Sequence, residues 1–145
     1  MSKIISYKGQ LPIGEQDRIK LKTIKGKVGY KINKFQIIIS DTTDTSYQLV
    51  AQVFKTDQTG SISANIDFSN GDLLAVAHAD AENNFNNGSI IIFDNEKFNQ
   101  DIFITMLDTD GGTTAGNYYL ELEAMELSDL ESTYLTLQSM RTISE

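Results

Sequence analysis

The chain of 145 residues suits one domain with a substantial core, and 40% hydrophobic and 22% charged residues are typical of a soluble globular protein. It has no cysteine and no run of about 20 apolar residues, which excludes a disulfide framework, a thiol nucleophile and a membrane helix. The net charge of −8 is unevenly spread: residues 1–34 carry nine basic and two acidic residues, whereas the remaining 111 carry three basic and eighteen acidic ones. We expect the basic segment to pair with acidic groups of its own chain or of a neighbouring subunit. We do not expect nucleic acid as a partner, because an acidic body repels phosphate.

The first 17 residues show little periodicity and contain Gly9, Pro12 and Gly14. We expect them to form an extended N-terminal arm, ordered only on assembly, ahead of a β-domain over residues 18–145. Deleting residues 1–14 would then leave the body folded but abolish its attachment to a partner. The candidate interaction residues of the arm are Ile4, Ile5, Tyr7, Lys8 and Leu11.

From residue 18 onward, apolar and polar residues alternate over short segments, which is the pattern of half-buried β-strands. The alternation predicts strands over residues 18–25, 28–40, 47–55, 61–68, 89–93, 102–106 and 118–124. In 28–40 the apolar parity changes after Lys34, which predicts a β-bulge or a strand that passes between two sheets. Residues 73–79 form a mostly apolar run that suits either a buried strand or the start of a short helix.

Turn segments rich in Gly, Asp, Asn and Thr separate these strands. About eight strands at short spacing, without helical patterns between them, predict an all-β fold: a single β-sandwich or jelly roll. Only the C-terminus differs. Ser128 and Glu131 fit a capping box, and Leu130, Tyr134, Leu137 and Arg141 follow at helical spacing, which predicts one short helix near residues 128–143.

Residues suited to catalysis do not form a complete constellation in the sequence. His78 lies on an apolar segment without a nucleophile elbow, and a lone histidine in such a place is more often structural. Glu121, Glu123 and Glu126 could act as paired carboxylates from one strand face, but the charged outer face of any half-exposed strand has the same pattern. We therefore expect a protein that is not an enzyme.

Acidic turns raise the question of a metal site. Residues 108–112 (Asp-Thr-Asp-Gly-Gly) resemble the opening of a calcium loop, but Tyr119 stands where the bidentate Glu would be. The pair Asp41 and Asp44 is equally incomplete. The sequence predicts no cofactor and no dedicated metal site, and leaves opportunistic calcium binding by these loops open.

Four segments stand in a characteristic order: residues 29–37 (GYKINKFQI), 66–75 (IDFSNGDLLA), 98–105 (FNQDIFIT) and 117–123 (NYYLELE). As a set they resemble a small family of proteins encoded by marine tailed bacteriophages, and the resemblance covers about residues 26–143. None of them is a catalytic or ligand-binding signature. The resemblance implies a virion structural protein that is made in the host cytoplasm and sits on the capsid surface as a decoration or cement protein.

The resemblance also implies the partners: the major capsid protein and further copies of the chain itself, with a trimer as the expected homo-oligomer. No membrane partner is expected. The alternative is a receptor- or carbohydrate-binding module of a phage tail or fibre, which a β-sandwich with long polar loops would equally suit. This alternative requires a solvent-facing aromatic cluster, for which Tyr118, Tyr119 and Phe85 are the candidates.

Overall fold

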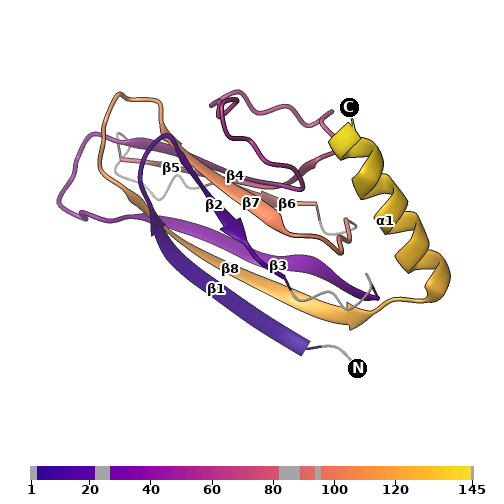
Figure 1. Ribbon diagram of the computed structural model, residues 1–145. Helices are drawn as coiled ribbons and strands as arrows, with labels where there is room; N and C mark the ends of the chain where they lie inside the picture. The colour runs from indigo at the N-terminus through magenta and orange to yellow at the C-terminus, as the bar shows by residue number, and fades with distance from the viewer. Residues whose placement is uncertain (1–2, 22–26, 82–88, 94–95, 145) are drawn as a thin grey trace.

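The computed structural model describes residues 3–21, 27–81, 89–93 and 96–144, with side chains of the last helix up to Gln138. The strands are β1 (Lys3–Leu11), β2 (Glu15–Ile19), β3 (Val28–Ile39), β4 (Gln48–Phe54), β5 (Leu73–Asp80), β6 (Ser89–Ile92), β7 (Ile102–Asp108) and β8 (Gly116–Glu126), and they are followed by helix α1 (Asp129–Ser144). They form two antiparallel sheets, in the orders β1-β8-β3 and β2-β7-β4-β5-β6, stacked as a sandwich with α1 at one end (Figure 1). The predicted eight-stranded β-sandwich with one C-terminal helix is confirmed. Among the described residues, no helix is long and apolar enough to cross a membrane.

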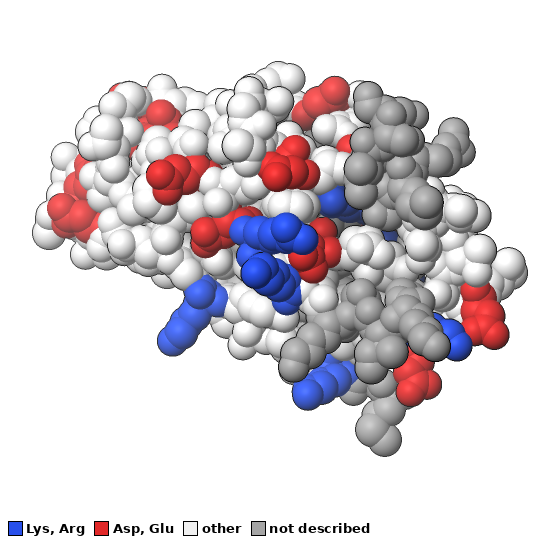
Figure 2. Space-filling view, in the orientation of Figure 1, with Lys and Arg blue, Asp and Glu red and all other residues white. Residues whose placement is uncertain are grey.

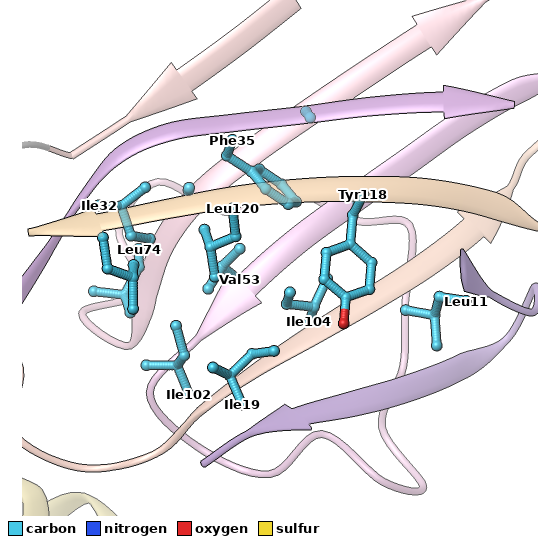
Figure 3. Packing of buried hydrophobic residues seen from close by; sticks show 14 of the residues in the cluster. Leu11, Ile19, Ile32, Phe35, Val53, Leu74, Ile102, Ile104, Tyr118 and Leu120 are labelled. Carbon is cyan, nitrogen blue, oxygen red and sulfur yellow. The ribbon is translucent and has the colours of Figure 1, made fainter. Parts of the chain in front are cut away.

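The core lies between the sheets and is made by alternate residues of each strand (Figure 3). In β8, Tyr118, Leu120 and Leu122 point inward and are buried, whereas Tyr119 between them lies on the outer face. Phe35 of β3 is fully buried. Burying one such side chain stabilises the fold by about 1.5–3 kcal/mol, so this alternating set fixes which face of each strand turns inward.

The parity change in β3 is a β-bulge. The register of β3 against β8 runs regularly to Ile32, opposite Leu122, and resumes with Lys34 opposite Glu121. Asn33 is the extra residue, and its Nδ2 atom donates to Glu123 at 3.4 Å. Of the two readings that the sequence allowed, the bulge is the one found.

The N-terminal segment differs from the expected arm. Residues 3–11 form β1, an edge strand paired with β8 along its whole length, from Lys3 opposite Ala124 to Leu11 opposite Gly116. Leu11 is only 1% exposed and belongs to the core. Residues 15–17, also assigned to the arm, lie in β2 of the other sheet. The boundary expected at residue 17 therefore does not separate an arm from a body in the described structure.

Gly9 is the reason why the sequence pattern does not predict strand β1. This glycine faces inward and interrupts the apolar alternation of Ile5, Tyr7 and Leu11. Its missing side chain is replaced by the ring of Tyr118 from the neighbouring strand: a Cβ atom on Gly9 would lie 2.8 Å from Tyr118 Oη and 2.9 Å from Cζ. The cross-strand aromatic residue thus covers the glycine and completes the inner face.

The predicted strand over residues 61–68 is also wrong, because this segment is a loop across the outer face of the five-stranded sheet. Both edges of β4 and β5 are already paired, which leaves no edge beside them for another strand. The side chain of Gln52 is 2% exposed and donates to the carbonyls of Ser63 at 3.0 Å and Asn65 at 3.4 Å. The ring of Phe68 packs edge-on against Phe93, with 5.3 Å between centroids.

Three further predictions concern residues 73–79, the start of the C-terminal helix and the strand over residues 18–25. Residues 73–79, which left strand and helix open, lie in β5. Helix α1 begins with the predicted capping box: Ser128 Oγ accepts from the Glu131 amide at 3.1 Å, and the Glu131 carboxylate accepts from the Ser128 amide at 3.4 Å. The predicted strand over 18–25 is shifted, since β2 ends at Ile19, and residues 22–25 lie outside the described chain.

Candidate interaction site

The outer face of the three-stranded sheet carries the predicted interaction segment. The side chains of β1 that point outward include Ile4, which is 52% exposed, and Lys8. In the register of the sheet, Ile4 lies opposite Glu123 and Lys8 lies opposite Tyr119 of β8. β1 is the terminal strand of its sheet, so among the described residues its other edge has no strand beside it.

The five predicted interaction residues do not share one surface. Ile4 and Lys8 point outward, whereas Ile5, Tyr7 and Leu11 point toward the core, and Leu11 is fully integrated in it. The strand period of two separates the set, since odd-numbered residues of β1 face one side of the sheet and even-numbered residues the other. The candidate site is therefore reduced to Ile4, Lys8 and the free edge of β1.

Two residues of the basic segment pair with acidic groups of their own chain, one of the two kinds of partner expected. Arg18 binds Asp101 with 2.7 Å between Nη2 and Oδ2, and Lys27 lies 3.7 Å from Asp129. In the sheet register, two lysines of β3 stand directly opposite two glutamates of β8: Lys31 opposite Glu123 and Lys34 opposite Glu121. Figure 2 shows several basic side chains of one face beside acidic ones. Cross-strand pairs of opposite charge stabilise a sheet by a few tenths of a kcal/mol to about 1 kcal/mol each.

Tyr118 joins the two sheets through a polar contact. Its ring covers Gly9 in the three-stranded sheet, and its hydroxyl donates to Asp17 Oδ2 of β2 in the other sheet at 2.9 Å. Burial, together with the adjacent carboxylate that accepts this hydrogen bond, raises the pKa of the Tyr118 phenol far above its ordinary value of about 10. Burial raises the pKa of Tyr7 as well, and the charge of Asp101 adds to the effect. The neutral phenol is thus the form that the fold stabilises.

Replacing Tyr118 by Phe is expected to lower the free energy of unfolding by about 1–2 kcal/mol at neutral pH, because the hydrogen bond to Asp17 is lost. A phenol with a raised pKa in the fold contributes stability that is complete below pH of about 10 and declines as the pH rises toward the folded-state value. The wild type should therefore lose more stability than Tyr118→Phe between about pH 9 and pH 11. Thermal melts across this range measure the effect. The matched control is Tyr119→Phe, on the exposed side of the same strand, and equal alkaline slopes for all three proteins would contradict the assignment.

The catalytic and metal candidates of the sequence are scattered. His78 lies in β5, opposite Val50 of β4 on one side and Ser89 of β6 on the other. Glu121 and Glu123 lie on the outer face of β8, opposite lysines. Within the described part of the chain, no group of three or more His, Asp or Glu side chains is placed to hold a metal ion.

The two acidic turns do come together. Ser46 Oγ hydrogen-bonds Asp110 Oδ2, and the amide of Gln48 donates to Asp108 Oδ1 at 3.1 Å. The other carboxylate oxygen of Asp108 is buried and accepts no hydrogen bond from the part of the chain that the structure describes. Gly112 is held close to it, because a Cβ atom there would overlap Asp108 Oδ2. The contact explains why residue 112 is a glycine. Calcium binding by these loops stays a prediction.

The aromatic candidates for ligand binding do not cluster. Tyr118 is 6% exposed and faces the core, whereas Tyr119 is 36% exposed on the opposite side of the sheet. Phe85 lies outside the described residues. Neighbours in a strand point to opposite faces, so the Tyr-Tyr pair cannot present two rings to one ligand.

A pocket that the sequence did not suggest lies beneath helix α1. Its volume is about 130 Å³, and it is lined by residues 55–56, 71–72 and 97–101 and, from the helix, by Leu135 and Gln138. Lys55 on its wall is largely buried and pairs with Glu96 at 3.1 Å. The lining comes from four separate segments of the chain, so no local pattern could have indicated the pocket.

Comparison with protein-family models gives no match to this chain, and comparison with curated proteins gives none either.

Proposed function

We propose that this chain is a non-enzymatic structural protein of a tailed-phage virion, bound to the outside of the head as a decoration or cement protein. The sequence resemblance implies that the protein is part of a phage virion. The observation that supports binding to the capsid is the free edge of β1, a nine-residue strand with a regular register from Lys3 to Leu11. The partners are the major capsid protein at this edge and other copies of the chain.

Strand addition is the mode of attachment that this edge supports. An edge strand presents a row of backbone N–H and C=O groups that a strand of another protein can pair with. Ile4 adds an exposed apolar side chain beside that edge, and Lys8 adds a positive charge. Because β1 is already ordered on the sandwich, its binding avoids the entropy cost that ordering a disordered arm would require.

Purified virions of the encoding phage test the assignment directly. We expect the chain in many copies per particle, in a fixed ratio to the major capsid protein on a quantitative gel. A particle reconstruction should place it on the outer surface of the head. Its absence from virions, or its restriction to a few copies at the tail, would exclude the capsid role.

Charge reversal at the free edge tests the mode of attachment. The double variant Ile4→Glu/Lys8→Glu is expected to remain folded, since both side chains are exposed, and to lose binding to particles that lack the protein. The matched control is Ile38→Glu, which changes a 61% exposed side chain on β3 at the opposite edge of the same sheet. Particle binding by the double variant at wild-type level would remove β1 from the interface.

The pocket beneath α1 favours a second candidate, the carbohydrate-binding module of a tail or fibre. Its lining residues include the polar Asp72 and Gln100 and the apolar Phe98 and Leu135, a mixture that suits the hydroxyls and the C–H face of a sugar. Titration of the labelled protein with glucose, galactose and N-acetylglucosamine, followed by NMR, tests it. Saturable shifts confined to residues 97–101 would favour this function over the capsid role.

A further inference from the structure

The turn that leads into β5 contains an exposed Asn-Gly pair, Asn70 and Gly71. A glycine after an asparagine carries no side chain to shield its backbone nitrogen, so this nitrogen can reach the side-chain amide of the asparagine. Gly71 is open in this way in the folded protein: a Cβ atom built on it would have no heavy atom of the described chain within 4 Å, apart from its neighbours in sequence. Both groups are therefore accessible to each other and to water.

The hydrogen bonds of the turn orient the side chain and leave the glycine nitrogen free. Asn70 Oδ1 accepts from the Asp72 amide at 3.0 Å. This contact folds the side chain over the following peptide bond and polarises its carbonyl. The backbone of Asn70 is fixed as well, since its amide donates to Asp67 O at 3.1 Å and its carbonyl accepts from the Leu73 amide at 3.2 Å. Within the described part of the chain, the Gly71 amide donates no hydrogen bond.

We propose that Asn70 is a site of spontaneous modification, at which the chain converts its own asparagine into isoaspartate and aspartate. The Gly71 nitrogen forms a bond to Asn70 Cγ, and the side-chain nitrogen leaves as ammonia, which takes up the proton that the Gly71 nitrogen loses. The product is a succinimide ring. A water molecule then opens the ring: attack at Cγ gives aspartate, whereas attack at the backbone carbonyl gives isoaspartate, in which the main chain runs through the former side chain.

Other asparagine and aspartate residues lack this combination of features. In the pair Asp110 and Gly111, the glycine amide donates to Asp108 O at 3.3 Å, so its nitrogen is held in another contact. Asn99 is only 1% exposed and is followed by a glutamine. Asn87 is followed by a glycine but lies outside the described residues. Among the described asparagines, we therefore expect Asn70 to react first.

The modification changes the turn at the wall of the pocket beneath α1. It adds one negative charge to a segment that already carries Asp67 and Asp72, and it changes the net charge of the chain from −8 to −9. Isoaspartate also lengthens the main chain by a methylene group directly before Gly71, which lines the pocket together with Asp72. The carbonyl that accepts from the Leu73 amide becomes a free carboxylate, so the turn rearranges at the start of β5.

Mass spectrometry of the aged protein tests the proposal. The full chain is kept at physiological temperature and pH in ¹⁸O-labelled water, then digested, and fragmentation reads Asn70 and Asn87 separately. Asn70 should take up ¹⁸O and give more isoaspartate than aspartate, while Asn99 stays an amide. Gly71→Ala should fold like the wild type, because there is room for its Cβ atom, and should react at least about tenfold more slowly, because the methyl group shields the nitrogen.

The same reaction in urea separates the effect of the fold from that of the sequence. Asn70 should react in the folded chain within a fewfold of its rate in the unfolded chain, whereas Asn99 should react only after unfolding. Protection of Asn70 by the fold as strong as that of Asn99 would overturn the proposal. So would Gly71→Ala reacting at the wild-type rate, or aspartate formed without isoaspartate. None of these outcomes bears on the capsid assignment, since the test uses the purified chain alone.

Discussion

Deleting residues 1–14 is expected to unfold the sandwich, not merely to detach it from a partner. The deletion removes β1, which pairs with β8 over nine residues, and with it the buried Leu11 and the partly buried Ile5 and Tyr7. Each fully buried side chain of this size contributes about 1.5–3 kcal/mol. The total loss approaches the whole stability of a domain, which is about 5–15 kcal/mol. It also leaves a central strand, β8, as an unprotected edge.

Circular dichroism during a thermal melt measures this outcome. The shortened chain should show no cooperative transition, or should aggregate. The matched control is Ile4→Ser/Lys8→Ser, which removes only outward-facing side chains of β1 and should melt close to the wild type. A cooperative melt of the shortened chain near the wild-type temperature would instead restore the separate N-terminal arm that the sequence suggested.

Two single-residue deletions in adjacent strands are expected to have opposite outcomes. Removing Asn33 takes out the bulge, after which Ile32 opposite Leu122 is followed directly by Lys34 opposite Glu121 in a regular register. We expect a folded protein that has lost about 1–2 kcal/mol, the contribution of local hydrogen bonds. Removing Glu121 instead shifts half of β8 by one residue and turns its buried side chains outward.

The Glu121 deletion should therefore cost more than about 5 kcal/mol, since exposing each buried leucine costs about 2–5 kcal/mol. Denaturant unfolding of both variants beside the wild type provides the measurement. The comparison is matched because each deletion removes one polar residue, and because Lys34, next to the bulge, faces Glu121. Equal losses from the two deletions would show that the bulge does not absorb the parity change.

Local signals in the sequence predicted several elements correctly. The alternation of Leu49, Ala51 and Val53 indicates the inner face of β4, because a strand that buries one face must repeat with period two. The parity change near Lys34 indicated, for the same reason, either a bulge or a strand that passes between two sheets, and the register of β3 against β8 shows the bulge. The Ser128–Glu131 capping box marked the start of α1, since both of its hydrogen bonds join residues three apart. Each of these signals depends only on neighbours along the chain.

The errors arose where a contact distant in the sequence decides the structure. Residues 61–68 alternate like a strand, but β4 and β5 are already paired on both sides, so the segment became a loop held by Gln52. β1 lacks a regular alternation of apolar and polar residues because Gly9 has no side chain. The ring of Tyr118, more than one hundred residues further along the chain, fills the space instead. Backbone pairing depends on which edges are available, and period alone carries no information about that.

The sequence by itself therefore determined the fold class, the periodicity of most strands, the place of the parity change in β3 and the cap of the helix, because these follow from the chemistry of residues close together in the chain. Only the tertiary structure decided that β1 is part of the body and that Ile4 and Lys8 separate from Ile5, Tyr7 and Leu11. It also decided which side of α1 faces solvent. Helical spacing marks Leu130, Tyr134 and Leu137 as one stripe, but the buried Asn99, which binds Thr136, is what turns that stripe outward.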